Sequence, residues 1–122
     1  MGRSERGAVL GPLESAAMDV LWRAGDPLPV RAVLAELNRD REPPLAYTTV
    51  MTVLSRLAER GIARRHRAGR GYAYEAALAS PADIAVRQLL DEHGEAAVAS
   101  FVDHVDGDAR LRERLRRLVE GR

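Results

Sequence analysis

Residues Leu45–Ile62 read LAYTTVMTVLSRLAERGI and carry the clearest periodic pattern in the chain. Apolar side chains recur there at the spacing of one helix face, at Val50, Val53, Leu54 and Leu57. The opposite face holds hydroxyls, one thioether and two charges, at Thr48, Thr49, Met51, Thr52, Ser55, Arg56 and Glu59. Gly61 follows where a left-handed glycine commonly ends a helix. The stretch therefore predicts an amphipathic helix over residues 47–60 with a threonine-rich polar face.

Two further helices are predicted before this one. Pro12 suits the first helical position, and Gly25-Asp26-Pro27 ends the first helix. A second helix starts near Pro29, and residues 38–44 form a polar loop that ends in Pro-Pro. Their apolar stripes are Leu13, Ala17, Val20 and Leu21 in the first helix, and Val30, Val33, Leu34 and Leu37 in the second.

A β-hairpin is predicted after Gly61. Residues 62–66 and 72–76 are extended in pattern, and the glycine-containing segment 67–71 reads as the loop between them. Three helices and a hairpin then make one small domain over residues 10–79. Residues 1–9 show no periodicity and are predicted to be disordered.

Residues 80–122 are predicted to form a separate helical domain that dimerises. Ser80-Pro81 and Asp108 are typical helix starts. The apolar stripe of these helices is longer than a small neighbouring domain can cover, so a second copy of the chain is the predicted partner; folding back onto the first domain is the alternative. The residues assigned to dimerisation are Ile84, Leu89, Leu90, Val98, Phe101, Val102, Val105, Leu111, Leu115, Leu118 and Val119.

Charge is distributed unevenly along a nearly neutral chain. All 19 basic residues are arginine, against 18 acids, for a net charge of +1. Between residues 56 and 70 six arginines face only Glu59. A local basic patch of this kind indicates nucleic-acid binding; the alternative is an arginine-rich codon bias.

Several other functions are disfavoured by composition. Without cysteine or lysine the chain has no thiolate metal site and no phosphate-binding loop of the glycine-rich lysine type, and it shows no hydrolase motif, so we predict neither an enzyme nor a cofactor. Residues 103–108 superficially resemble a calcium loop, but Val102 stands at the first ligand position, and His66, His93 and His104 are dispersed, so no metal is predicted. No apolar run reaches membrane-spanning length and the start has no signal peptide, which predicts a soluble, cytoplasmic protein without membrane insertion.

DNA binding is the chemistry that these features favour. A major groove about 12 Å wide admits one α-helix, and hydroxyls with a thioether suit close approach to base edges, while neighbouring arginines can neutralise phosphates. An ordinary small helical protein is the alternative at this point. The residues assigned to DNA are Tyr47, Thr48, Thr49, Met51, Thr52, Ser55, Arg56, Arg64, Arg65, Arg67 and Arg70.

The same residues resemble a known family. Leu45–Ile62 is similar to the signature helix of the penicillinase repressor family (BlaI/MecI/CopY type), and residues 14–22, 71–74 and 98–102 resemble its first helix, its wing and its dimerisation helix. The resemblance covers about residues 10–120. It implies a mainly α fold, with a winged helix-turn-helix domain followed by a helical dimerisation domain, and a homodimeric transcriptional repressor on an inverted-repeat DNA operator.

The resemblance also implies roles for single residues. It nominates Thr48, Thr49, Met51 and Thr52 for contacts in the major groove. Some relatives carry basic residues where Thr48 and Met51 stand, so contact with thymine methyls is favoured here over bidentate reading of guanine. In the wing, Arg67 and Arg70 would reach phosphates or the minor groove.

Two branches of the family differ in how the repressor is released. In the β-lactamase branch a membrane sensor metalloprotease leads to cleavage before the Phe of the dimerisation helix; the matching bond here is Ser100–Phe101, with Ser where that branch has Asn. The copper-responsive branch uses a C-terminal cysteine cluster, which this chain lacks. The competing hypothesis is a protein-interaction adaptor that uses the winged domain as a platform without specific DNA binding.

Overall fold

A computed structural model describes residues 10–121, whose contacts divide into two units with the boundary after Ile84. The N-terminus predicted to be disordered, residues 1–9, lies outside the described residues. The sequence pattern divides the chain at Ser80, whereas the contacts divide it a few residues later. The reason is that Ile84 is only 2% exposed and packs into the core of the first unit.

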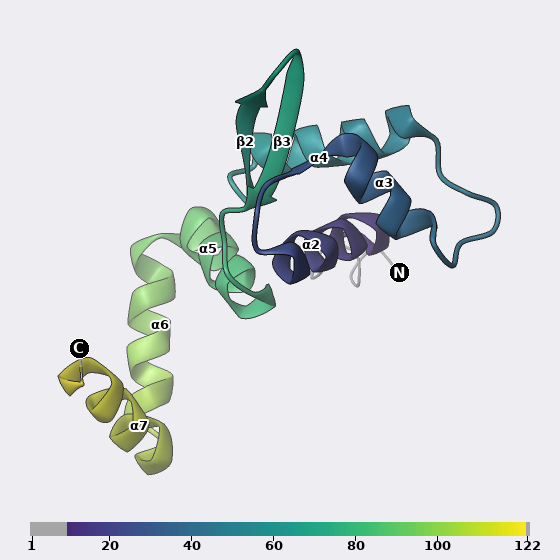
Figure 1. Cartoon of the computed structure of the whole chain (residues 1–122). Helices are drawn as coiled ribbons and strands as arrows, with labels where there is room; N and C mark the ends of the chain where they lie inside the picture. The colour runs from purple at the N-terminus through teal and green to yellow at the C-terminus, as the bar shows by residue number, and fades with distance from the viewer. Residues whose placement is uncertain (1–9, 122) are drawn as a thin grey trace. The chain divides into compact units, whose positions relative to one another are not determined.

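The first unit is a winged helix-turn-helix arrangement (Figure 1). Its elements are α2 (Pro12–Ala24), β1 (Leu28–Pro29), α3 (Val30–Asn38), α4 (Tyr47–Glu59), β2 (Ala63–Ala68) and β3 (Gly71–Ala76). The strands form one antiparallel sheet in the order β1-β3-β2. The three helices occur where the apolar periodicity predicts them.

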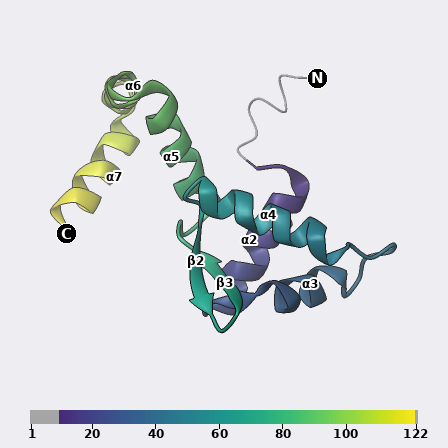
Figure 2. The same cartoon turned by 90° about the horizontal axis from the view of Figure 1, so that it is seen from above.

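The hairpin differs from its prediction in the length of its turn. Ala68 pairs with Gly71, so the strands run almost to the tip and only Gly69 and Arg70 form the turn, instead of the predicted five-residue loop. Gly69 has φ +61°, a left-handed conformation that a glycine adopts without a Cβ penalty. In Figure 1 the hairpin extends beyond the helices as a wing, and Figure 2 shows the same hairpin from above.

The apolar stripes of the three helices meet in one core. Its largest fully buried side chains are Met18, Val33, Val50, Leu54 and Leu57. Each such side chain contributes about 1.5–3 kcal/mol when removed from water. The core therefore fixes α4 by one face and leaves its other face outside.

Three hydrogen bonds tie separate parts of this unit together. The Trp22 Nε1–H donates to the carbonyl of Leu78 at 2.8 Å, which joins α2 to the segment after β3. The Asn38 side chain donates to the Leu45 carbonyl at 3.1 Å and accepts the Leu45 N–H at 2.8 Å. This double contact spans the polar loop and sets the point from which α4 begins.

The second unit consists of helices. α5 (Pro81–His93) starts within the first unit, and α6 (Glu95–Asp106) and α7 (Ala109–Glu120) follow. The predicted caps are confirmed: Ser80 Oγ accepts the Asp83 N–H at 3.1 Å, and Asp108 Oδ1 accepts two N–H groups of α7. Gly94, at φ +53°, separates α5 from α6, at the residue where the predicted apolar stripe loosens.

Candidate nucleic-acid interface

The threonine-rich face of α4 lies in solvent. Val50, Leu54 and Leu57 point into the core, which turns the opposite face outward. Exposed on that face are Tyr47, Thr48, Thr49, Met51, Thr52 and Arg56, while Ser55 is half-buried. The three threonine hydroxyls make no hydrogen bond to any other part of residues 10–121. The helix thus presents unpaired short donors and acceptors, as the sequence predicts.

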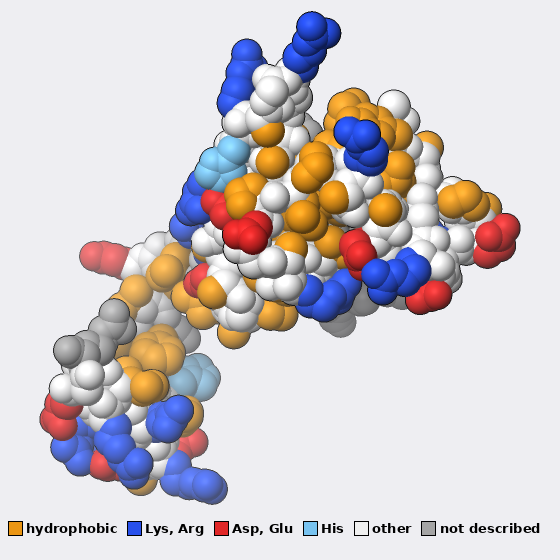
Figure 3. All heavy atoms as spheres, viewed as in Figure 1, with side chains coloured by type: hydrophobic (Ala, Val, Ile, Leu, Met, Phe, Trp, Pro, Cys, Tyr) orange, Lys and Arg blue, Asp and Glu red, His pale blue; other side chains and the backbone are white. Residues whose placement is uncertain are grey.

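The wing carries a stacked pair of arginines on one of its faces. The guanidinium of Arg65 lies 4.4 Å from the centre of the Tyr72 ring, and that of Arg67 lies 5.7 Å from it. Arg67 Nη1 also donates to the Tyr72 hydroxyl at 3.4 Å. Cation–π contacts hold a guanidinium in place while leaving its N–H groups free to bind an anion. Figure 3 shows basic side chains at the far end of the wing.

Arg64 lies on the other face of the wing, because successive side chains of a strand alternate. Its Nη1 donates to Glu75 Oε2 at 3.2 Å, and His66 Nε2 lies 2.5 Å from the same oxygen. The hydrogen bond from His66 is the main cause that lowers the pKa of Glu75; burial acts in the opposite direction and Arg64 lowers it further. Arg64 is therefore partly neutralised within the protein, unlike Arg65 and Arg67.

Replacement of Glu75 is expected to make the stability of the wing less dependent on pH. A carboxylate whose pKa is lowered on folding stabilises the folded state above its unfolded pKa, here 4.5, and this gain is lost as pH falls through the lower folded value. The difference in unfolding free energy between wild type and Glu75→Gln, from urea titrations at about pH 6 and about pH 3, should shrink at the lower pH. Glu59→Gln, at an exposed glutamate of α4, is the control for the loss of one carboxylate from the same unit.

A hollow of about 550 Å³, which we call the wing hollow, lies between α3, α4 and the wing. Its lining includes Tyr47 and Met51 of α4, Tyr72 of the wing, and two arginines, Arg31 and Arg70. Sequence reasoning missed Arg31. The available signal was a lone cation in the first turn of a helix that has no acid there.

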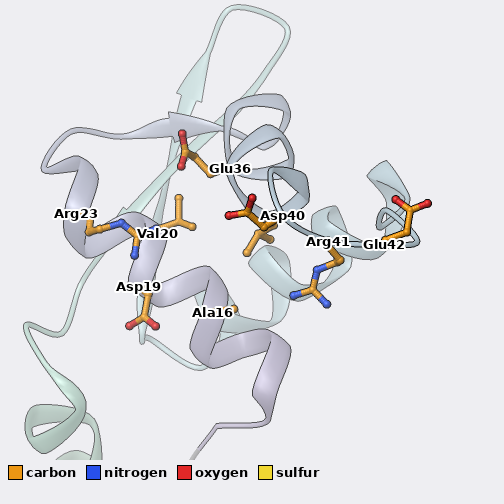
Figure 4. A pocket seen from close by; sticks show the side chains of 9 residues that line it. Ala16, Asp19, Val20, Arg23, Glu36, Asp40, Arg41 and Glu42 are labelled. Atoms are coloured by element: carbon orange, nitrogen blue, oxygen red, sulfur yellow. The ribbon is translucent and has the colours of Figure 1, made fainter.

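A second hollow, of about 520 Å³, lies between α2, α3 and the loop after α3 (Figure 4). We call it the charged hollow. Its lining carries four carboxylates and two guanidiniums, from Asp19, Glu36, Asp40, Glu42, Arg23 and Arg41. This excess of negative charge disfavours a phosphate backbone, so the charged hollow and the wing hollow differ in electrostatic character.

The segment that superficially resembles a calcium loop serves as a helix connection. Gly107 ends α6 and Asp108 caps α7, so the Asp108 carboxylate is already engaged by backbone N–H groups. Within residues 10–121 no three His, Cys, Asp or Glu side chains are grouped as metal ligands. No helix in that range has both the length and the apolar content to cross a bilayer.

The second unit exposes most of the residues assigned to dimerisation. Among residues 85–121 Val105, 5% exposed, is the single buried hydrophobic side chain. Leu115 is half-buried, and Ile84 belongs to the core of the first unit. About half or more of each remaining side chain is in solvent: Leu89, Leu90, Val98, Phe101, Val102, Leu111, Leu118 and Val119, together with Val86, which the sequence reasoning did not assign. Burial thus removes Ile84 from the candidate dimer surface.

Comparison with known proteins finds one matching family and two similar proteins, each over most of the chain. The family model described as penicillinase repressor matches residues 10–121. Two curated relatives, each described as transcriptional regulator BlaI, come from Mycobacterium tuberculosis strains CDC 1551 / Oshkosh and ATCC 25618 / H37Rv. Each is 39% identical to this chain over 106 residues, which cover 81% of the chain and 75% of the relative.

Proposed function

The chain belongs to the penicillinase repressor family of transcriptional regulators, and from this premise we propose that it binds an inverted-repeat operator as a homodimer. In this proposal α4 occupies the major groove, and its threonines and Met51 contact base edges, chiefly thymine methyls. The arginines of α4 and the wing hold the flanking phosphates. The two half-sites lie about one helical turn, roughly 34 Å, or a small multiple of it apart.

The single observation that carries the DNA-binding proposal is the outward threonine face beside a stacked arginine pair. An exposed helix face would ordinarily be stabilised by acid–base pairs at helical spacing. Within residues 10–121 the outward hydroxyls of Thr48, Thr49 and Thr52 have no hydrogen-bond partner, and Arg65 and Arg67 are held by Tyr72 rather than by carboxylates. The threonine hydroxyls and the two guanidiniums are therefore available to bind DNA.

The dimer is supported by the exposure of apolar side chains in the second unit, where Val105 is the single buried hydrophobic side chain among residues 85–121. Helices whose apolar side chains remain in water gain stability when a partner covers them. In the homodimer α5, α6 and α7 of one chain would bury these side chains against those of the second copy. Two linked winged units would then bind two half-sites with a higher affinity than either unit alone, because binding of the first raises the effective concentration of the second.

Release by proteolysis is the regulatory part of the proposal. Ser100 and Phe101 are exposed in the middle of α6. Cleavage between them would separate Phe101, Val102 and all of α7 from the DNA-binding unit. A membrane sensor protease system is the proposed source of the signal, as the family resemblance implies, although Ser100 replaces the Asn of that branch.

Salt dependence of DNA affinity is the test of the proposed function. If roughly five or six arginines of each subunit neutralise phosphates, the logarithm of the association constant should fall against the logarithm of salt concentration with a slope of about −9 to −11. The association constant is measured by fluorescence anisotropy at each salt concentration. One labelled duplex carries an inverted repeat from the DNA upstream of the gene, and the other carries a scrambled sequence. Equal affinity for the two duplexes, or a slope near zero, would instead favour the adaptor hypothesis.

A further inference from the structure

The wing hollow carries positive charge that no carboxylate of its lining balances. Arg31 enters it from α3 and Arg70 from the turn of the wing. The charged hollow, which is nearly equal in volume, provides an internal comparison, because its four carboxylates outnumber its two arginines. An anion is therefore attracted to the wing hollow and repelled from the charged hollow.

Arg31 has no ion-pair partner within residues 10–121. Its side chain is exposed, and it stands at the second position of α3. A cation there faces the positive end of the helix dipole, and the first turn of α3 contains no acid to offset it. The position is unfavourable for the isolated chain and becomes favourable when an external anion binds.

The wing hollow also lies on the path that a DNA strand would follow. Its walls include Tyr47 and Met51 from the start of α4, and Tyr72 from the wing. With α4 in the major groove and the wing on an adjacent stretch of backbone, the strand between these contacts crosses the hollow. Phosphates follow one another at about 3.4 Å along the axis of each strand, so one lies over the hollow in any register.

We propose that Arg31 binds a backbone phosphate of the DNA strand that crosses the wing hollow, with Arg70 on the facing wall. This inference rests on the proposed DNA-binding function and adds to it a backbone contact from α3. A phosphate contact carries no base information, so Arg31 positions the protein on DNA of any sequence and does not select the operator.

The test compares Arg31→Ala with Arg23→Ala in the full-length chain. Arg23 is an exposed arginine of α2 in the lining of the charged hollow, so it controls for the loss of one positive charge from the same unit. Fluorescence anisotropy with a labelled duplex of mixed sequence is measured at several salt concentrations. Arg31→Ala should weaken binding roughly tenfold and make the salt slope of the dimer less negative by about 2. Arg23→Ala should change neither value appreciably.

Two further variants keep the result interpretable. Arg31→Lys should recover part of the affinity, because a lysine still offers a charge to one phosphate. The melting temperature of Arg31→Ala should equal or slightly exceed that of wild type, because a cation is lost from the positive end of the α3 dipole. If Arg67→Ala weakens binding while Arg31→Ala behaves like Arg23→Ala, the inference about Arg31 is overturned and the proposed function stands. If wild type does not bind the duplex, both are overturned.

Discussion

A chain shortened after Ser100 is expected to sediment as a monomer and to bind its operator about 10²- to 10⁴-fold more weakly than the full chain. The shortened chain keeps the whole first unit, including α4 and the wing, but loses Phe101, Val102 and α7. It therefore retains the contacts to one half-site and loses the linkage to the second. Analytical ultracentrifugation gives the oligomeric state, and fluorescence anisotropy gives the affinity for a two-site and a one-site duplex.

A full-length variant separates loss of the dimer from damage by truncation. Phe101→Asp places a charge on a side chain that is 53% exposed, so the monomer should fold normally while the proposed interface is disrupted. Ala99→Asp adds the same charge at another exposed position of α6 and is the matched control. The proposed interface is wrong if the shortened chain and Phe101→Asp both remain tight dimers.

Leu54→Ala is expected to lower the free energy of unfolding by about 2–5 kcal/mol. Leu54 is completely buried on the inner face of α4 and stands at the centre of the helix that carries the threonine face. For a domain of this size the loss corresponds to a drop in melting temperature of about 10 °C or more. Thermal unfolding followed by circular dichroism measures it.

Thr52→Ala is the matched substitution on the outer face of the same helix. Thr52 is exposed, and alanine favours helix formation, so the melting temperature should stay the same or rise slightly. Its effect should appear in DNA binding, as a changed ranking of operator variants at the base pair that it contacts. Equal melting temperatures for Leu54→Ala and wild type would mean that the inner face of α4 does not anchor the helix.

Periodicity was sufficient to predict the helices, because each buries one continuous stripe. Most core positions of α2, α3 and α4 were predicted, but the stripe given for α2 missed the fully buried Met18 and included Leu13, which lies outside the core. The caps at Ser80 and Asp108 follow from short polar side chains before a helical pattern. The outward face of α4 followed automatically, since a helix that buries Val50, Leu54 and Leu57 must expose Thr48 and Thr52.

Features that depend on distant partners were not predictable in this way. β1 has only two residues, one of them proline, and it is a strand only because β3 lies beside it. The tip of the wing was predicted as a loop from its glycines, but cross-strand pairing extends through Ala68 and Gly71. Arg31 could not be assigned to the interface from sequence, because it lines the wing hollow only after α3, α4 and the wing pack around it.

The shortage of buried apolar side chains in the second unit has a consequence for gene control. If its interior is completed only by another copy, folding of this unit depends on how many copies the cell contains. While most chains remain single and the operator is mostly unoccupied, the amount of paired protein and the promoter occupancy both vary with the square of the total, so halving expression lowers occupancy by more than half. Repression by such a protein would depend steeply on its own concentration. Dilution during rapid growth would then relieve repression without any inducer.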